Sequence, residues 1–410
     1  MNEEVKLDPP PRVARLVLVT PKGAVVGRLA PVPVETPWWQ DAQSVVLAVR
    51  KHYGIEVTIL RLLETVRDRP HGGEVTYLAE VTRPLPAEVW AGQIRPHPFR
   101  QNYAEAGGPA ADLAWAARIM AGHGLKPAGP PVQIRTWNLS SIWRIPVVGR
   151  SLWLKVVPPF FIHEASIITA LAGRPVPELL GHDRGRMLLT EVAGEDMHGA
   201  SLPWLLEMVT LLVEMQSSWI GRLDQLRSMG LPDWSSQALA AAIGYVVERA
   251  SGELSRNENL LLERFVNGLS SRFSAIASCG LPDTLVHGDF HPGNFRGTER
   301  ALTLLDWGDS GIGHPMLDQP AFLVGVPPGH ATTIKNHWER TWLECLPSCE
   351  PARAAGLLAP IAAARQAVIY RQFLDNIEPT EQVYHRQDQA DWLRRTAALM
   401  GAEIWTSVAM

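Results

Sequence analysis

The sequence feature that most constrains this chain is the stretch of residues 286–318. It reads VHGDFHPGNF, continues after a short turn with LTLLDWG, and passes through GIGHP to Asp318. It contains three polar residues, Asp289, Asn294 and Asp306, which are separated by apolar residues and by residues that favour turns. Because the order, the spacing and the strand context agree, the stretch indicates a chemical site rather than a surface loop.

Two short apolar runs organise this stretch. Leu285-Val286 and Leu302-Leu305 lie on either side of Gly297-Thr298, a pattern that predicts two paired strands joined by a turn. Asp289 follows the first run and Asp306 follows the second. The pattern therefore predicts that each strand delivers a carboxylate at its end.

These residue types suit phosphoryl transfer from a nucleotide. That reaction needs a carboxylate to orient the attacking hydroxyl and oxygen ligands that hold magnesium against the phosphates. Asp289 fits the first task, and Asp306, at the end of a strand, fits the main metal ligand. The amide oxygen of Asn294 also binds a hard cation, and Pro292 and Gly293 bend the loop that aims it.

The stretch resembles the active-site signature of the aminoglycoside phosphotransferase and choline kinase-like family, which is related to the protein kinases. In that family His-Gly-Asp-x-His-x-x-Asn is the catalytic loop, and Asp-Trp-Gly stands where protein kinases carry Asp-Phe-Gly. The resemblance implies that Asp289 is the catalytic base and that Asn294 and Asp306 bind magnesium. It further implies that His287 braces the loop and that Asp318 is a buried acid that holds the loop backbone.

A different enzyme class uses some of the same letters. Residues 288–291, Gly-Asp-Phe-His, also resemble the first metal-binding motif of metallophosphoesterases, in which Asp and His bind a two-metal centre. That centre needs further ligands downstream, and the histidines after Asn294 are scattered single residues: His314, His330, His337 and His385. The missing ligands make this alternative the weaker one.

Lys155 is the candidate nucleotide ligand. It lies inside the apolar run 152–157, where a lysine is costly unless its ammonium meets an anion such as phosphate. Glu164 opens the next predicted helix, 163–171, and the family resemblance implies that it pairs with Lys155. The alternatives are a solvent-facing lysine on an edge strand and an acid that only favours the first turn of a helix.

Two further segments are assigned to the nucleotide. Asn138 to Ser141 joins the predicted strands 132–137 and 142–147, and small polar residues such as Ser140 and Ser141 let backbone amides approach phosphates. A plain hairpin turn explains the same residues equally well. By resemblance to the kinase hinge, the backbone of three residues binds adenine: Glu191, Val192 and Ala193.

Residues 1–105 lie outside the kinase pattern. Strands at 15–20, 23–27, 57–63 and 74–81 enclose a predicted helix at 41–53, an order that resembles a Nudix fold. The magnesium-binding Nudix helix carries an Arg and several Glu residues, whereas this chain has Leu47, Ala48, Lys51 and His52 at those places, with only Gly54 and Ile55 retained. The N-terminal region is therefore predicted to be a docking or substrate-covering module without hydrolase activity.

The whole chain is predicted to be an α+β protein with a bilobal protein-kinase-like fold, preceded by the small α/β Nudix-like domain. The Pro-rich and Gly-rich stretch 84–109 indicates a linker. The predicted domains are residues 1–105, a small kinase lobe at 106–195, and a large helical lobe at 196–410 that carries the catalytic loop.

Charged residues near the C-terminus have two interpretations. Asp375, Glu378, Glu381 and Asp388 could bind the ammonium groups of an aminoglycoside. They alternate with five arginines, which favours a solvated charged helix face: Arg365, Arg371, Arg386, Arg394 and Arg395.

Composition narrows the partners and the compartment. A net charge of -4, with 46% hydrophobic and 20% charged residues, is typical of a globular protein and gives no reason to expect nucleic acid or a membrane as partner. The acidic start and the absence of long apolar runs predict a cytoplasmic location. The three cysteines, Cys279, Cys345 and Cys349, are expected to be ordinary thiols.

Together these patterns predict a kinase that uses ATP, or another nucleoside triphosphate, with Mg²⁺ to phosphorylate a hydroxyl of a small molecule such as an aminoglycoside, a sugar or an amino alcohol. The alternative is a nucleotide-binding pseudokinase that acts as an interaction module. The sequence does not identify the acceptor, the nucleotide base or the oligomeric state.

Overall fold

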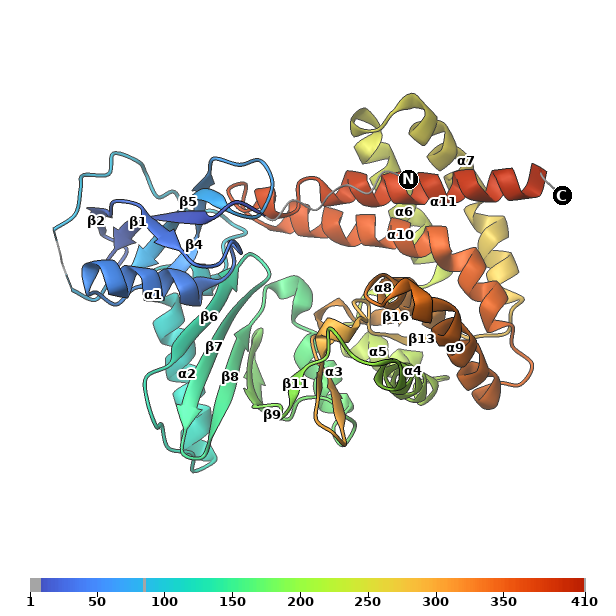
Figure 1. Ribbon diagram of the computed structural model, residues 1–410, viewed down its shortest axis with the longest axis horizontal. Helices are drawn as coiled ribbons and strands as arrows, with labels where there is room; N and C mark the ends of the chain where they lie inside the picture. The colour runs from blue at the N-terminus through green and yellow to red at the C-terminus, as the bar shows by residue number, and fades with distance from the viewer. Residues whose placement is uncertain (1–8, 84–85, 409–410) are drawn as a thin grey trace. The chain divides into compact units, whose positions relative to one another are not determined.

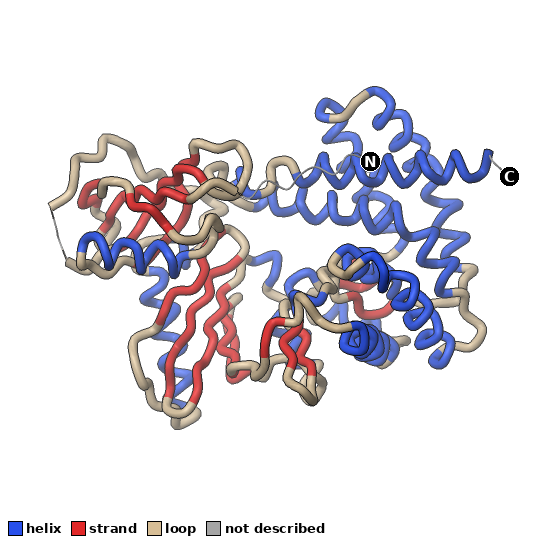
Figure 2. Tube along the Cα trace, in the orientation of Figure 1, coloured by secondary structure: helices blue, strands red, loops and turns tan. Residues whose placement is uncertain are grey.

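A computed structural model describes residues 9–83 and 86–408, with side chains up to residue 403. The chain forms two compact units. Unit 1 comprises Met1–Ile162, Leu179–Glu191 and Leu374–Arg386, and unit 2 comprises His163–Glu178, Val192–Phe373 and Gln387–Met410. Figure 2 shows that strands dominate unit 1 and helices dominate unit 2, which confirms the predicted α+β class. The division at 105 and 195 stays a prediction.

The first sheet of unit 1 is built from the N-terminal residues. Its strands are β1 (Arg12–Val19), β2 (Val25–Arg28), β3 (Val32–Val34), β4 (Thr58–Thr65) and β5 (Gly73–Glu80). Their order is β2-β1-β5-β4, with β3 on β1, and β1 runs parallel to β5. Helix α1 (Ala42–Tyr53) lies against this sheet (Figure 1) and shares its core.

Local signals set the limits of α1. The carboxylate of Asp41 accepts a hydrogen bond from the Ser44 amide at the N-terminus, and Gly54 ends the helix in the left-handed conformation at φ 66°. The predicted element order of this region is confirmed, except that β3 was not predicted because its Val-Pro-Val sequence reads as loop. Leu47, Lys51 and His52 lie on the exposed part of α1, and the resemblance to Nudix proteins stays a prediction.

The second sheet of unit 1 has the order β6-β7-β8-β10-β9. The strands are β6 (Val132–Trp137), β7 (Ser140–Val147), β8 (Arg150–Val156), β9 (Leu179–Asp183) and β10 (Arg186–Thr190). Helix α2 (Gly108–Gly122) covers one face (Figure 1), where Trp115, Ala116 and Met120 pack on strand residues such as Leu152 and Leu154. In this strand order β8 is the central strand, paired with β7 on one edge and with β10 on the other.

The C-terminal segment Leu374–Arg386 packs within unit 1, because its acids are held in the interior of that unit. Glu378 forms ion pairs with Arg61 at 3.6 Å and with Arg100 at 2.8 Å, and all three side chains are at most 7% exposed. The Glu381 carboxylate accepts from the amide of Leu62 at 3.3 Å. The expectation of a solvated acidic face is therefore wrong for Glu378 and Glu381, and their burial also removes them from any ammonium-binding surface.

Glu381 makes the stability of unit 1 depend on pH. Burial, followed by repulsion from Glu378, raises the pKa of Glu381 to about 8. Because this folded-state pKa lies above the unfolded value of about 4.3, the unfolded state loses its proton first, and the free energy of unfolding falls as pH rises from that value towards 8.

We expect Glu381→Gln to leave the free energy of unfolding nearly unchanged at acidic pH and to raise it above pH 8. The glutamine keeps an acceptor for the Leu62 amide and never ionises. Urea unfolding across the pH range measures the difference. The control is Glu64→Gln, at an exposed position of β4, the strand that contains Leu62. A difference between variant and wild type that does not vary with pH would contradict this reading.

Unit 2 is mainly helical. Its helices are α3 (Glu164–Ala170), α4 (Leu202–Ser217), α5 (Leu223–Ser228), α6 (Ser236–Ala250), α7 (Arg256–Ala277), α8 (Gln319–Val324), α9 (Ala331–Cys345), α10 (Pro351–Asn376, ending in unit 1) and α11 (Asp388–Val408). Two small sheets lie among them, of order β11-β14-β15 and β12-β16-β13. Their strands are β11 (Glu195–Asp196), β12 (Asp233–Trp234), β13 (Thr284–Val286), β14 (Phe295–Gly297), β15 (Leu302–Leu304) and β16 (Gly311–Gly313).

The pairing of these short strands corrects one expectation. The runs around Leu285 and Leu304 were predicted to pair with each other, but β13 pairs with β16, and β15 pairs with β14. The turn after Gly297 joins β14 to β15 instead. All three residues of β13 are buried, so this strand is an internal support for the loop that follows it.

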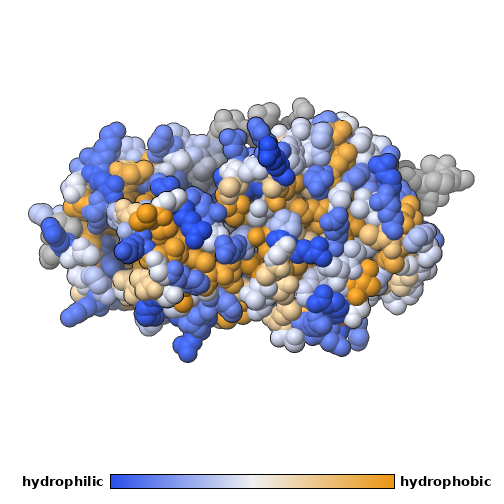
Figure 3. All heavy atoms as spheres, turned by 90° about the horizontal axis from the view of Figure 1, so that it is seen from below, coloured by the Kyte–Doolittle hydropathy of each residue, from blue (hydrophilic) through white to orange (hydrophobic). Residues whose placement is uncertain are grey.

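Hydrophilic and hydrophobic side chains are mixed over the face shown in Figure 3. Among the described helices, none combines the length and the hydropathy needed to span a bilayer.

Candidate active site

Strand β13 leads directly into the loop 287–294, and Asp318 holds the start of this loop. The Asp318 carboxylate accepts hydrogen bonds from the amide of His287 at 2.9 Å and from the amide of Gly288 at 2.8 Å. It also accepts from Nε2 of Gln216 on α4 at 2.9 Å, and the acid is 1% exposed. These contacts fit the predicted structural role of Asp318, which stays a prediction.

Arg365 supports the same loop from α10 and was misread in the sequence. Its Nη2 donates to the carbonyl of Gly288 at 3.2 Å, its guanidinium lies 5.4 Å from the ring centre of Trp234, and it is 1% exposed. Burial lowers the pKa of Arg365, while Asp318 is the strongest of the charges that oppose this shift. The expected solvated face is wrong here, and the signal was available, because Arg365 interrupts the apolar run IAAARQAVI.

Gly288 is required by the conformation of the loop. Its φ is +91°, and a Cβ added at this position would stand 1.9 Å from the carbonyl oxygen of Asp309. Only glycine adopts this conformation without strain, and it also lets the 287–294 loop approach the chain that follows β15.

We expect Gly288→Ala to abolish activity and to lower the free energy of unfolding by roughly 2 kcal/mol or more, because it adds a backbone clash to an unfavourable φ. Thermal melting and a turnover assay check this. Gly268→Ala is the matched control, since a Cβ at Gly268 on α7 meets nothing within 4 Å. Normal turnover in Gly288→Ala would show that the loop tolerates a different conformation.

His287 connects the two halves of the site. Its ring is fully buried, its Nε2 lies 3.0 Å from the carbonyl oxygen of Leu305, and it packs edge-on against Trp307 with ring centres 4.7 Å apart. Burial lowers the pKa of His287, so the ring is neutral and donates from Nε2 to Leu305. The bracing role implied by the family resemblance fits these contacts, because His287 fixes the residue before Asp306.

Asp289 lies on the accessible side of the loop, with its side chain 44% exposed. One carboxylate oxygen is 3.4 Å from Nε2 of His291. Burial acts to raise the pKa of Asp289, but the hydrogen bond and charge of His291 outweigh it, so the pKa lies below its usual value. Asp289 is therefore ionised at neutral pH and available as an acceptor.

His291 is a site residue to which the kinase interpretation of the sequence assigned no role. Its Nδ1 accepts from the amide of Gly293 at 3.1 Å, which leaves Nε2 to carry hydrogen towards Asp289. Burial lowers the pKa of His291, and the larger opposing effect of Asp289 raises it overall. The sequence signal for His291 was its spacing from Asp289: with one residue between them in the same loop, the two side chains can come into contact.

Asn294 and Asp306 are brought to the same place by the backbone. The Leu305 amide donates to the carbonyl of Asn294 at 2.8 Å, which sets Asp306 beside the end of the 287–294 loop. Asn294 Nδ2 donates to the carbonyl of Asp289 at 2.8 Å and to its carboxylate at 3.1 Å. Because the amide nitrogen is committed to Asp289, the amide oxygen of Asn294 is left for a cation.

Asp306 has an unfavourable backbone conformation of a kind that is often found at functional sites. Its φ of 59° and ψ of 67° lie in the left-handed region, which aspartate tolerates better than most side chains. Its side chain is exposed at the start of the 3-10 helix Trp307–Asp309. The three predicted residues Asp289, Asn294 and Asp306 therefore meet within unit 2.

His163 is a second residue that the sequence missed. It directly precedes α3, and its ring lies against the backbone of Gly308 and Ser310, just after Asp306. Burial lowers the pKa of His163 to about 4 in spite of these carbonyls. The contact ties the start of α3, and hence the position of Glu164, to the loop that carries Asp306.

The predicted nucleotide residues are divided between the units. Lys155 lies in β8, the central strand of its sheet, which rules out the edge-strand alternative. Glu164 is the first residue of α3 in unit 2 and is 1% exposed. Since their pairing joins the two units, it stays a prediction.

The segment 138–141 is not an open loop. Ser140 and Ser141 belong to β7, and their hydroxyls accept from the indoles of Trp137 and Trp143, both at 3.2 Å. Asn138 donates to the carbonyl of Glu381 at 3.2 Å. The hairpin-turn interpretation therefore describes these side chains, and a phosphate contact would be left to the backbone.

The expected hinge falls where the chain passes from unit 1 to unit 2, between Glu191 and Val192. Glu191 is exposed and accepts from the amide of Ser151 at 3.1 Å. Val192 and Ala193 are outside any helix or strand. Adenine binding by this backbone stays a prediction.

Among the described residues there is no group of three or more His, Cys, Asp or Glu side chains placed to hold a metal.

Part of the chain is similar to known proteins. Residues 142–319 match the model of the phosphotransferase enzyme family. A choline/ethanolamine kinase family protein from Mesorhizobium loti is similar at 19% identity, covering 71% of this chain and 94% of that chain with a TM-score of 0.50. Choline kinase LicA from Streptococcus pneumoniae is similar at 12% identity, covering 72% and 99% with a TM-score of 0.52.

A macrolide 2'-phosphotransferase type I is also similar, at 16% identity, covering 71% of this chain and 97% of that chain with a TM-score of 0.50. No curated protein matches the sequence. These likenesses confirm the predicted fold, and the matched family model covers the stretch that contains Asp289, Asn294 and Asp306.

Proposed function

We propose that this chain is a small-molecule kinase that moves the γ-phosphoryl group of ATP, or of another nucleoside triphosphate, to a hydroxyl of a small molecule. The match of residues 142–319 to the phosphotransferase enzyme family supports the proposal. The observation that carries the proposal is the meeting of Asp289, Asn294 and Asp306, with the Asn294 amide nitrogen turned to Asp289. An aminoglycoside, a sugar or an amino alcohol is the class of acceptor proposed.

Asp289 acts on the acceptor. Its low pKa keeps the carboxylate ionised, so it accepts a hydrogen bond from the acceptor hydroxyl and turns the oxygen lone pair towards phosphorus. The new bond forms between that oxygen and the γ-phosphorus, the bond to the bridging oxygen breaks, and a nucleoside diphosphate leaves. The hydroxyl proton passes to Asp289.

The donor set fits magnesium. Asp306 presents an exposed carboxylate and Asn294 an amide oxygen, and hard oxygen ligands of this kind, few in number, leave room for phosphate oxygens. When bound there, the ion neutralises charge on the phosphates. The other contacts to the phosphates come from protein side chains. Lys155 is proposed to contact the phosphates, and Glu164 is proposed to orient the Lys155 ammonium.

A transfer assay tests this proposal. Purified protein is incubated with γ-labelled ATP or GTP and a panel of aminoglycosides, sugars and amino alcohols, and the modified hydroxyl of any product is mapped. We expect magnesium-dependent transfer to at least one alcohol and its loss on chelation with EDTA. If nucleotide binds in the presence of magnesium but no alcohol on a broad panel is phosphorylated, the pseudokinase alternative replaces this one.

A further inference from the structure

The two oxygens of the Asp289 carboxylate have different surroundings. Nδ2 of Asn294 donates to Oδ2 at 3.1 Å, and Nε2 of His291 lies 3.4 Å from the same oxygen. Among the described residues, none donates to Oδ1. The side chain is 44% exposed, and Oδ1 is not one of the buried polar atoms that lack a partner. Oδ1 is therefore the oxygen that is open to a ligand.

The loop backbone sets the direction of the His291 ring. Its Nδ1 accepts from the Gly293 amide at 3.1 Å, so the hydrogen of the ring is on Nε2, which faces Asp289. The ring also lies close against Gly293, where an added Cβ would stand 3.0 Å from both Nδ1 and Cε1. Because the side chain is 32% exposed, these local contacts rather than core packing hold the ring in place.

The contact between His291 and Asp289 restricts the carboxylate. At 3.4 Å it is longer than an ordinary N–H···O hydrogen bond, and contacts of this kind at catalytic groups shorten when the substrate binds. The last torsion of an aspartate is otherwise broad and two-fold, so either oxygen can face outward. Two donors on Oδ2, one from His291 and one from Asn294, oppose that rotation and keep Oδ1 in one direction.

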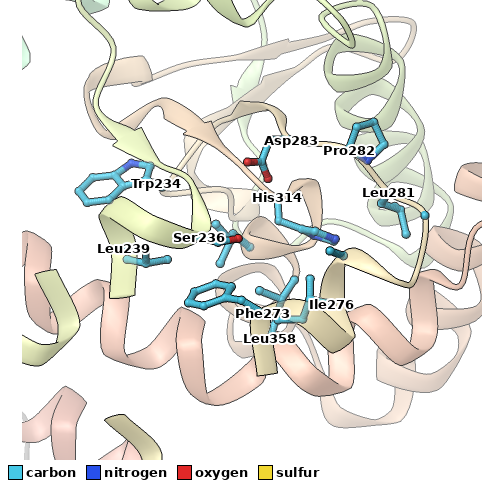
Figure 4. A pocket seen from close by; sticks show the side chains of 13 residues that line it. Trp234, Ser236, Leu239, Phe273, Ile276, Leu281, Pro282, Asp283, His314 and Leu358 are labelled. Carbon is cyan, nitrogen blue, oxygen red and sulfur yellow. The ribbon is translucent and has the colours of Figure 1, made fainter. Parts of the chain in front are cut away.

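The apolar pocket of unit 2 shown in Figure 4 does not extend to this carboxylate. Its volume is about 390 Å³, and side chains such as Leu239, Phe273 and Leu358 predominate in its lining. The residues that line it include neither Asp306 nor any residue of the 287–294 loop. An acceptor whose hydroxyl meets Asp289 therefore binds outside that pocket.

We propose that His291 is a positioning residue, which holds Oδ2 of Asp289 so that Oδ1 faces the acceptor hydroxyl. This inference rests on the proposed function. The hydroxyl proton passes to Oδ1 while the acceptor oxygen bonds to the γ-phosphorus and the nucleoside diphosphate leaves, and His291 keeps its own hydrogen throughout. A carboxylate that is oriented before the reaction loses less freedom in the transition state, which raises the rate.

Two substitutions separate the two contacts of His291. Asparagine places its oxygen where Nδ1 was and keeps an acceptor for the Gly293 amide, but it lacks the donor to Asp289. Glutamine extends an N–H to the place of Nε2 and lacks the acceptor near the backbone. The first variant therefore removes the positioning contact alone, and the second removes the local turn contact alone.

Steady-state kinetics and thermal melting measure the outcome. We expect His291→Asn to lower kcat by roughly 10- to 100-fold, the factor for one hydrogen bond to a charged group. The KM values for nucleotide and acceptor and the melting temperature should stay close to those of the wild type, since the lost contact acts in the transition state. His291→Gln should recover most of kcat at a lower melting temperature.

His97→Asn is the matched control. Nδ1 of His97 accepts from the amide of Phe99 at 3.3 Å, which is the same bond across two residues that His291 makes to Gly293. His97 lies in the segment 84–109, outside the 287–294 loop. We expect this variant to turn over as the wild type does.

A double variant tests whether His291 acts through Asp289. If it does, adding His291→Asn to Asp289→Asn causes no further loss of kcat. A further loss, or a raised acceptor KM with unchanged kcat in His291→Asn, would show direct contact with the acceptor and overturn the proposal.

The remaining outcomes distinguish this inference from the proposed function. Wild-type kcat in His291→Asn overturns the inference and leaves the proposed function intact. Failure of the wild type to phosphorylate any alcohol overturns the proposed function, and this inference with it. If His291→Asn does not fold, His291→Gln decides, and loss of its turnover at normal nucleotide affinity overturns the inference.

Discussion

Replacing Asp289 with asparagine is expected to reduce phosphoryl transfer by roughly 10²- to 10⁴-fold, the range typical for loss of a general base. The asparagine oxygen still accepts from Asn294 Nδ2, which donates to the Asp289 carboxylate at 3.1 Å in the wild type. The loop should therefore keep its conformation. What is lost is the negative charge that orients the acceptor hydroxyl and takes its proton.

The measurement compares turnover with nucleotide affinity in the same variant. We expect magnesium-dependent nucleotide binding, measured by calorimetry, to remain close to that of the wild type while turnover collapses. Asp196→Asn is the control, because Asp196 on β11 is exposed and accepts from the His198 amide at 2.8 Å, a bond that asparagine can retain. Undiminished turnover in Asp289→Asn would refute the assignment of the base.

Asp318→Ala is expected to lower the free energy of unfolding by roughly 3–5 kcal/mol, as removal of one partner from a buried charge network does. The amides of His287 and Gly288 lose their acceptor together, and Nε2 of Gln216 keeps only the carbonyl of Pro315. The buried guanidinium of Arg365 also loses Asp318, the carboxylate that contributes most to stabilising its positive charge. Because the two amides begin the 287–294 loop, turnover should fall with stability.

Urea unfolding measures the change in the free energy of unfolding. The Asp318→Asn variant provides an intermediate case. Asparagine retains one acceptor oxygen, so its loss of stability should lie between those of the wild type and the alanine variant. Glu299→Ala, at an exposed turn position in the same unit, is the control. A free energy of unfolding for Asp318→Ala close to that of the wild type would show that the buried hydrogen bonds are replaced by water.

Local sequence was sufficient wherever a feature depends on neighbouring residues. The start of α1 at Asp41 and its end at Gly54 follow from capping and from the left-handed preference of glycine. The 287–294 loop likewise draws Asp289 and Asn294 together over five positions, through a hydrogen bond from one side chain to the other. Such contacts involve short loops, whose closure costs little conformational entropy.

The tertiary structure decided which distant segments meet. The sequence predicted a strand at β13 but assigned it the wrong partner, because a three-residue apolar run pairs equally well with any similar run. It also placed Arg365 and Glu381 in solvent, whereas each is buried against a segment far away in the chain. Charge alone does not reveal burial, since a charged residue becomes an interior one only when the fold supplies its partner.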